Sequence, residues 1–320
     1  MLYGIIRRIF RNSVYKRNDY SDSVYYFSAA DFPGLTEEKY EITASGGHTL
    51  FGRFYRYAGT SDQRIIIFEH GMGAGHKSYM KEIELLCRGG YTVFAYDHTG
   101  SGESGGDSTG GFVGSLIDLN DVLSALKADP RFLGASYSIV GHSWGGFSAM
   151  NIAAFHPDVT HVVALSGFIS VEAIIEQYAG KIPFGMAKRL YAEELRNNEK
   201  FVSSTAERAL GGSSVKALII HSRDDKTVSA AEHFDKLREA LSNNRNISFI
   251  ELSDREHNPN YTRAAIEYKK EFFKAHNRIA KRLGRMTKEE KLEFISGFDF
   301  DKMTEQDTEL WGKILEFLEK

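Results

Sequence analysis

Short apolar segments alternate with segments of helical spacing along most of the 320-residue chain. Six of the apolar segments are almost continuous, which is typical of strands buried on both faces of a parallel sheet. They span residues 64–70, 91–97, 137–143, 161–167, 216–222 and 247–253. Two earlier segments, 39–45 and 49–58, alternate apolar with polar residues on either side of Gly-Gly-His, which predicts an antiparallel pair at a sheet edge.

Helical patterns fill the intervals between these predicted strands. They cover residues 76–89, 115–128, 145–155 and 229–242. Strands that alternate with helices predict an α/β fold, with a mostly parallel eight-stranded sheet and helices on both of its faces.

Two regions depart from the alternation of strands and helices, and they determine the predicted domain organisation. The interval 169–214 separates two strands by more than one helix needs, which predicts a small helical cap, and the chain after about residue 263 looks helical throughout. The prediction therefore divides the chain into four parts. These are an N-terminal extension (1–38), a core (39–168 and 215–275), the cap (169–214) and a helical C-terminal extension (276–320).

Composition narrows the classes of function. A net charge of −3 at pH 7 argues against a general affinity for nucleic acid. The single cysteine, Cys87, excludes an internal disulfide and fits a reducing compartment, which predicts a cytoplasmic protein. Cys87 falls in the apolar stripe of a predicted helix, so we expect a buried structural thiol. No segment reaches membrane-spanning length.

The first 17 residues, MLYGIIRRIFRNSVYKR, form a basic and apolar segment. Arg7 and Arg8 interrupt its apolar run, so a secretory signal is not predicted. As a helix, the segment would carry apolar residues on one side and arginines on the other, and such a helix can lie on an anionic membrane surface. An extension packed on its own domain is the favoured interpretation, and membrane-surface contact through residues 1–17 is the alternative.

Residues 141–146 read GHSWGG between a predicted strand and a predicted helix. This is a G-x-S-x-G motif, whose sharp strand-to-helix turn projects the serine at the carboxyl edge of the sheet. We therefore predict that Ser143 is a nucleophile, placed at a helix N-terminus that favours developing negative charge. The N–H group of the next residue, Trp144, is the first predicted donor to an oxyanion.

A serine nucleophile needs a base and an orienting acid, and in this fold order both follow it along the chain. His257 lies in a turn-rich loop after the last predicted strand, from which it can reach the serine. His233 and His276 fall in helical patterns, so we expect them at the surface. Two adjacent carboxylates, Asp224 and Asp225, follow the seventh predicted strand, and spacing alone does not separate them.

Together these pieces resemble the α/β-hydrolase family over about residues 40 to 275. The matching motifs are HGMG (70–73), YDHTGSGES (96–104), GHSWGG (141–146), HSRDDKTV (221–228) and EHNP (256–259). Each lies at the end of a predicted strand, in the family's order. The resemblance implies the α/β-hydrolase fold and a serine hydrolase with a catalytic triad.

The resemblance also implies individual roles. The family's acid segment often ends D-x-x-V, a pattern that begins here at Asp225, so the resemblance favours Asp225 over Asp224 as the orienting acid. The loop after the third strand would supply the second oxyanion donor, the N–H group of Met72. The sequence departs from the family pattern at Thr99, where arginine is common, and at Ser222, where glycine is usual.

Two glycine-rich stretches imitate nucleotide-binding motifs. Residues 68–79, FEHGMGAGHKSY, approach a phosphate-binding loop, but His76 stands where that motif needs glycine before lysine. GSGESG (100–105) fits G-x-G-x-x-G, yet loop rather than helix follows it. No H-x-x-x-H or C-x-x-C spacing occurs. We expect no cofactor and no metal, and we assign the glycines of the first stretch to a transient oxyanion.

The complete set of Ser143, His257 and Asp225 predicts acyl transfer to water, with a small-molecule acyl substrate. The leading hypothesis is a carboxylic ester hydrolase for small or medium acyl esters or monoacylglycerol-like lipids. The alternatives are a peptidase or amidase of the same fold and a non-catalytic hydrolase-like binding protein. Apolar residues of the cap either line an acyl pocket under a mobile lid or pack the cap on the sheet. They are Phe168, Ile169, Tyr178, Ile182, Phe184, Met186 and Tyr191. The oligomeric state stays open.

Overall fold

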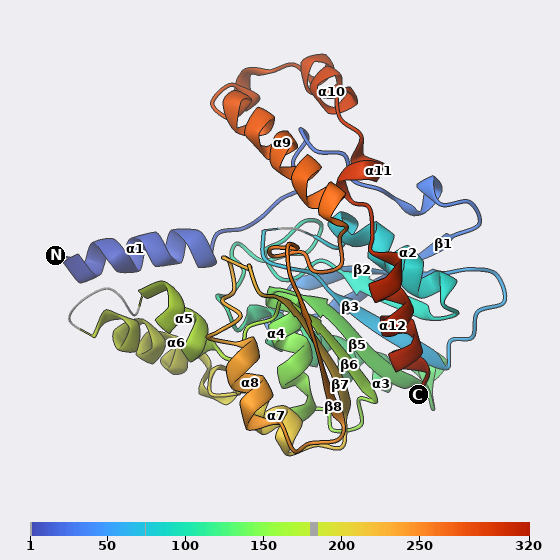
Figure 1. Ribbon diagram of the computed structural model, residues 1–320, viewed down its shortest axis with the longest axis vertical. Coiled ribbons are helices and arrows are strands. Elements are labelled where there is room, and N and C mark those ends of the chain that lie inside the picture. The colour runs from blue at the N-terminus through green and yellow to red at the C-terminus, as the bar shows by residue number, and fades with distance from the viewer. Residues whose placement is uncertain (1, 74, 180–184) are drawn as a thin grey trace.

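The computed structural model describes residues 2–73, 75–179 and 185–320, and one sheet of eight strands forms its centre (Figure 1). The strand order is β1-β2-β4-β3-β5-β6-β7-β8. The strands are β1 (Thr36–Thr43), β2 (Thr49–Arg56), β3 (Arg64–Glu69), β4 (Thr92–Tyr96), β5 (Ser136–His142), β6 (His161–Leu165), β7 (Lys216–Ser222) and β8 (Ile247–Leu252). All eight lie where the apolar pattern predicts them, with ends that differ by at most three residues.

The pairing of the strands explains the two kinds of apolar pattern. β1 pairs with β2 and β2 with β4 in antiparallel fashion, whereas the other neighbours are parallel. The edge strand β1 is largely exposed, while β3 and β4 in the middle are almost wholly buried. Because parallel strands end at the same edge, the loops after β3, β5, β7 and β8 meet there. The predicted fold is confirmed.

Helices cover both faces of the sheet (Figure 1). They are α1 (Leu2–Val14), α2 (Met80–Arg88), α3 (Gly114–Ala128), α4 (Trp144–Asn151), α5 (Val171–Ala179), α6 (Met186–Val202), α7 (Ala206–Gly211), α8 (Phe234–Ala240), α9 (Arg263–Ile279), α10 (Lys288–Ser296), α11 (Phe300–Met303) and α12 (Thr308–Glu319). α2 and α12 bury apolar side chains against one face, and α3, α4 and α8 bury theirs against the other. Within the described ranges, no helix is both long and apolar enough to cross a membrane.

The segment predicted as a cap contains α5, α6 and α7. Phe168, directly before this segment, stacks on Phe147 of α4 with ring centroids 4.6 Å apart, so the entry to the segment is packed onto the core. Tyr178 of α5 has more than half of its surface exposed to solvent. Two residues predicted for the cap, Ile182 and Phe184, lie outside the described residues.

The C-terminal segment contributes to the core as well as to the periphery. α9 and α11 form a separate apolar cluster, in which Phe272 and Phe300 pack with Phe27 of the N-terminal segment. α12 instead buries Trp311 and Ile314 in the cluster under the sheet. The domain boundaries stay a prediction, and α12 is the part of the predicted extension 276–320 that covers the sheet.

Cys87 is a buried residue of α2, as the apolar stripe predicts. Its thiol donates a hydrogen bond to the carbonyl oxygen of Tyr55 at 3.3 Å. Burial raises the pKa of the thiol to about 12. The thiol is therefore protonated at neutral pH and plays a structural part.

Candidate active site

The turn between β5 and α4 holds Ser143 in a strained backbone conformation. Its φ is +57° and its ψ is −112°, a region that residues with a side chain rarely adopt. A Cβ at Gly141 would lie 2.2 Å from the carbonyl oxygen of Gly145, and one at Gly145 would lie 2.1 Å from that of Glu69. The predicted strand-turn-helix is therefore present, and only glycines fit at these two positions.

Alanine at Gly145 and alanine at Gly312 should change stability in opposite directions. Both glycines lie in helices, but nothing lies within 4 Å of a Cβ at Gly312 of α12. We expect Gly145→Ala to lower the free energy of unfolding by about 1–3 kcal/mol through overpacking. Gly312→Ala should raise it by up to about 1 kcal/mol, because alanine is the better helix former. Urea unfolding measures both, and a neutral Gly145→Ala would contradict the tight turn.

The structure brings together the three residues that the sequence predicts as nucleophile, base and acid. Nε2 of His257 lies 2.8 Å from Oγ of Ser143, and Nδ1 lies 2.7 Å from Oδ2 of Asp225. They come from the loops after β5, β8 and β7, which meet at one edge of the sheet. The histidine loop is strained as well, since Asp254 and Glu256 have φ values of +59° and +48°.

Asp225 is the carboxylate that contacts the imidazole. Its Oδ1 accepts hydrogen bonds from the backbone N–H groups of Thr227 and Val228, at 2.8 and 3.0 Å. Burial alone would raise the pKa of Asp225, but hydrogen bonds from His221 and His257 hold it well below its ordinary value. The carboxylate therefore stays charged, and its two oxygens are fixed in direction.

Asp224 has a different environment. Its Oδ1 accepts a hydrogen bond from the Ser222 hydroxyl at 2.5 Å, and it lies 3.4 and 3.3 Å from the backbone nitrogens of Arg255 and Glu256. Asp224 therefore holds the loop that carries His257. The serine that stands where the family usually has glycine supplies one of these bonds.

The loop after β3 abuts the serine and is fixed by buried side chains. A Cβ at Gly71 would lie 3.4 Å from the Cβ of Ser143. The imidazole of His70 donates from Nδ1 to the Gly71 carbonyl at 2.8 Å and accepts the N–H of His98 at 3.0 Å. Burial lowers the pKa of His70 to about 3, so the ring is neutral, as this pairing requires. The two predicted N–H donors, Met72 and Trp144, follow Gly71 and the serine directly.

A chain of hydrogen bonds joins this loop to the histidine loop. The Tyr79 hydroxyl accepts the N–H of Gly71 at 3.1 Å and donates to Nδ1 of His142 at 2.9 Å. Nε2 of His142 then donates to the carbonyl oxygen of His257 at 2.7 Å. Burial lowers the pKa of His142 to about 3, so it bonds as a neutral ring. Sequence reasoning missed Tyr79, because it carries no motif and its contact with His142 spans 63 residues.

His233 is buried rather than exposed, which corrects the expectation from its helical pattern. α8 begins five residues later than predicted, so this histidine lies in the turn before the helix. Its Nε2 lies 3.0 Å from Oε1 of Gln177 in α5, and it ties the cap to the segment after β7. His276 is half-buried, with Nε2 2.9 Å from the Ser23 hydroxyl. Contacts between distant segments decide both positions, and local periodicity does not report them.

The two glycine-rich stretches that imitate nucleotide-binding motifs are held by the protein's own hydrogen bonds. His76, in place of the phosphate-loop glycine, is buried with Nδ1 2.7 Å from Oδ1 of Asp97. In the GSGESG region, the guanidinium of Arg17 donates to three backbone carbonyls at 2.8 to 2.9 Å. The Thr99 hydroxyl, at the position where the family often has arginine, donates to Asp118 at 2.6 Å.

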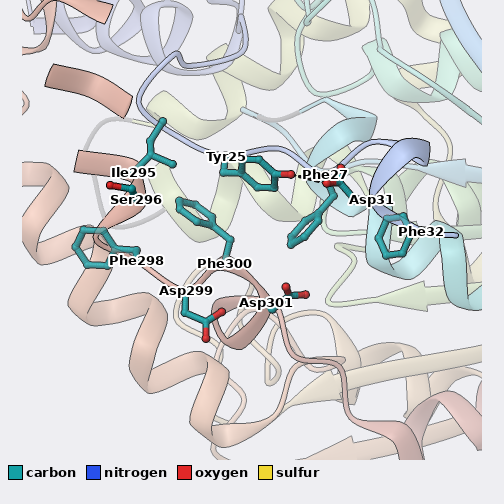
Figure 2. Close-up of a pocket in the computed structure, with 10 residues that line it drawn as sticks. All are labelled: Tyr25, Phe27, Asp31, Phe32, Ile295, Ser296, Phe298, Asp299, Phe300 and Asp301. Atoms are coloured by element: carbon teal, nitrogen blue, oxygen red, sulfur yellow. Dashed lines mark hydrogen bonds between the residues drawn. The ribbon is translucent and has the colours of Figure 1, made fainter. Parts of the chain in front are cut away.

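A hollow of about 440 Å³ between the N-terminal segment and α10–α11 shares no lining residue with the triad (Figure 2). Figure 2 shows the Tyr25 hydroxyl directed toward Asp31, and the two are 2.6 Å apart. A second lining carboxylate, Asp301, pairs with Lys81 at 2.7 Å. Over the described parts of the chain, no group of three or more His, Cys, Asp or Glu is arranged to hold a metal ion.

A mostly parallel eight-stranded sheet, with a strained serine in the turn after β5, defines the α/β-hydrolase class of fold. The family described as the alpha/beta hydrolase fold matches residues 64–238, which are 175 of the 320 residues. The chain therefore belongs to the alpha/beta hydrolase fold family.

Curated relatives of the chain include hydrolases of different substrates. Monoglyceride lipase from Rattus norvegicus is 31% identical over 140 residues, which cover 42% of this chain and 42% of the relative. The putative carbamate hydrolase RutD from Rhizobium rhizogenes is 29% identical over 100 residues, which cover 31% of this chain and 36% of the relative. The chain thus matches less than half the length of these relatives.

Solved structures show the same fold. The Pyrococcus furiosus esterase Pf2001 superimposes with a TM-score of 0.58 at 22% identity, over 84% of this chain and 98% of the esterase chain. An acylaminoacyl peptidase from Pyrococcus horikoshii gives a TM-score of 0.51 at 13% identity, over 70% of this chain and 37% of the peptidase chain. At these identities the likeness shows the fold alone, and fold does not fix the substrate.

Proposed function

We propose that the protein is a serine hydrolase that cleaves carboxylic esters through an acyl-enzyme on Ser143. The observation that carries this proposal is the continuous hydrogen-bonded path from Ser143 through His257 to Asp225. A serine hydroxyl is a weak nucleophile until a base takes its proton, and the base works best when a third group orients it.

In the first half-reaction, Oγ of Ser143 attacks the ester carbonyl carbon while its proton passes to Nε2 of His257. Asp225 keeps the proton of the imidazole on Nδ1 and stabilises the imidazolium. The N–H groups of Met72 and Trp144 stabilise the oxyanion, and one such donor typically contributes about 3 kcal/mol. The tetrahedral species then collapses, and the alcohol leaves with the proton from Nε2.

In the second half-reaction, water takes the place of the alcohol. His257 removes a proton from the water, whose oxygen attacks the acyl carbon. The bond to Ser143 breaks, the proton returns to the serine oxygen, and the carboxylic acid is released. The enzyme is then in its starting state.

Two of the four cap glutamates that could bind the amine of a peptide substrate, Glu193 and Glu194, already have partners within the protein, whereas Glu172 and Glu176 are exposed. A peptidase that recognises a free amine needs carboxylates to bind that amine. Glu193 pairs with Arg7 at 2.6 Å, and Glu194 is buried with a hydrogen bond from the Tyr15 hydroxyl. One of two cavities that touch Met72 has no charged residue among the described residues that line it. The name of one curated relative, a monoglyceride lipase, favours an ester substrate.

Hydrolysis of matched esters and amides tests this function. We expect p-nitrophenyl esters from acetate to dodecanoate to be cleaved, and the p-nitroanilides with the same acyl groups to be cleaved much more slowly. Release of nitrophenol under single-turnover conditions reports formation of the acyl-enzyme. Faster cleavage of the anilides would favour an amidase. A folded protein that cleaves neither series would favour a non-catalytic binding protein.

A further inference from the structure

The N-terminal helix α1 lies beside the cap helices α5 and α6, away from the sheet (Figure 1). Its Arg7 pairs with Glu193 of α6 at 2.6 Å. Its C-terminal end is held by the Thr109 hydroxyl, which donates to the carbonyl oxygen of Val14 at 2.6 Å. α1 lies outside residues 64–238, which match the family, so its place beside the cap is not specified by that match.

A cavity of about 440 Å³ lies between α1 and the cap. α1 contributes Ile6, Ile9 and Phe10 to its wall, and α5 contributes Ile175 and Ala179. No charged residue is among the described residues that line it. A cavity of this size with an apolar wall suits a hydrocarbon chain.

Three residues of the cavity wall belong to, or contact, loops of the proposed active site. Met72, which follows Gly71 on the oxyanion loop, is part of its wall. Phe112 is another part, and its carbonyl oxygen accepts the indole N–H of Trp144 at 2.6 Å. The Tyr178 hydroxyl donates to the carbonyl oxygen of Thr227, in the loop of the orienting acid, at 2.7 Å. The cavity therefore adjoins the proposed oxyanion loop at Met72.

A second cavity of about 440 Å³ also touches Met72, but its chemistry is different. Its wall includes Glu82, Lys269 and Asn258 as well as His142. Burying a hydrocarbon chain beside a carboxyl and an ammonium group is unfavourable, whereas a hydroxylated alcohol can form hydrogen bonds there. Phe272, Phe273 and Met303 also line this second cavity, so its wall is mixed, whereas the described wall of the cavity beside α1 carries no charged residue.

We propose that the cavity between α1 and the cap is the acyl-chain site, and that α1 selects esters of a single medium or long acyl chain. This inference rests on the proposed ester hydrolysis. The outer face of α1 is apolar too, since Leu2, Ile5 and Ile9 are 49%, 53% and 61% exposed. Ile9 belongs both to this stripe and to the cavity wall, so a chain can enter from free solution or from a lipid surface.

Tryptophan at position 6 tests the acyl-chain site, with tryptophan at position 5 as the matched control. Ile6 lines the cavity, and Ile5 lies on the same helix but points outward. We expect Ile6→Trp to lower kcat/KM for p-nitrophenyl decanoate by about 10-fold or more, because the chain loses its space. The value for p-nitrophenyl acetate should not change, and Ile5→Trp should change neither.

Ala179→Phe repeats the test from the opposite wall of the cavity, in case Ile6→Trp fails to fold. If both variants fold and keep the wild-type ratio of decanoate to acetate, the acyl-chain site is wrong. Fluorophosphonate labelling of Ser143 separates this failure from failure of the proposed function. A labelled serine with an unchanged ratio overturns only the acyl-chain site, whereas an unlabelled wild type overturns both.

A vesicle assay distinguishes the source of the acyl chain. The probe is a single-chain acyl ester held in phosphatidylglycerol vesicles, compared with the same ester below its aggregation limit. If Ile5→Glu slows only the vesicle reaction, the chain enters from the lipid surface, since anionic lipid attracts the arginines of α1. If Ile5→Glu slows neither reaction, the chain enters from solution. Either outcome for Ile5→Glu supports the acyl-chain site, provided that Ile6→Trp slows cleavage of the long-chain ester.

Discussion

Replacement of Ser143 by alanine is expected to lower kcat for ester hydrolysis by about 10⁵- to 10⁶-fold. The oxygen that attacks the ester is then absent, and only binding and the oxyanion hole remain. His257→Ala should lower kcat by a similar factor, because the hydroxyl 2.8 Å from its Nε2 is no longer activated. Steady-state rates with p-nitrophenyl butyrate measure both effects.

The double variant sharpens this prediction. When two residues act as one catalytic unit, removing either one already abolishes the contribution of both to kcat. The Ser143→Ala/His257→Ala double variant should therefore be no slower than either single variant. Circular dichroism and urea unfolding serve as controls for folding. A Ser143→Ala variant that keeps more than about a tenth of the wild-type kcat would show that the nucleophile is another residue.

Asp225→Asn is expected to lower kcat by about 10⁴-fold with little change in KM. Asparagine would direct its amide donor or a weaker acceptor at Nδ1 of His257, which favours the wrong tautomer of the imidazole. Hydrogen bonds from His221 and His257 hold the pKa of Asp225 well below its ordinary value, so the carboxylate is charged at neutral pH. Rates measured between pH 5 and 9 separate this loss from a simple shift of the pH profile.

Asp224→Asn is the matched control for this prediction. Asp224 contacts Ser222 and the backbone near Arg255, and not the imidazole. We therefore expect a loss of about 10-fold or less, caused by loosening of the histidine loop. A larger loss for Asp224→Asn than for Asp225→Asn would reverse the assignment of the orienting acid.

The strands and the nucleophile turn could be predicted from the sequence because both depend on local patterns. Strands buried on two faces must be almost continuously apolar, and β3 through β7 are. The turn at Ser143 needs glycine at Gly141 and Gly145, since a Cβ at either would meet backbone at 2.1 to 2.2 Å. Requirements of both kinds act on neighbouring residues, so they can be recognised as a pattern within one segment of the sequence.

Other features depend on contacts between distant segments and leave no such motif. Asp224 and Asp225 are adjacent in one loop, so spacing alone does not separate them; the resemblance favours Asp225, and the fold places Asp225 against His257. Tyr79 bonds to Gly71 and His142 across the site. The position of α12 under the sheet and that of α1 beside the cap likewise follow from packing, because many surfaces can accept an amphipathic helix.

Fluorophosphonate labelling determines whether Ser143 is a nucleophile that His257 activates. The wild type and His257→Ala are treated with the probe, digested and analysed by mass spectrometry. We expect one labelled peptide in the wild type, with the adduct on Ser143, and no adduct in the folded His257→Ala variant. A folded wild type without an adduct, or with the adduct on another residue, would contradict it.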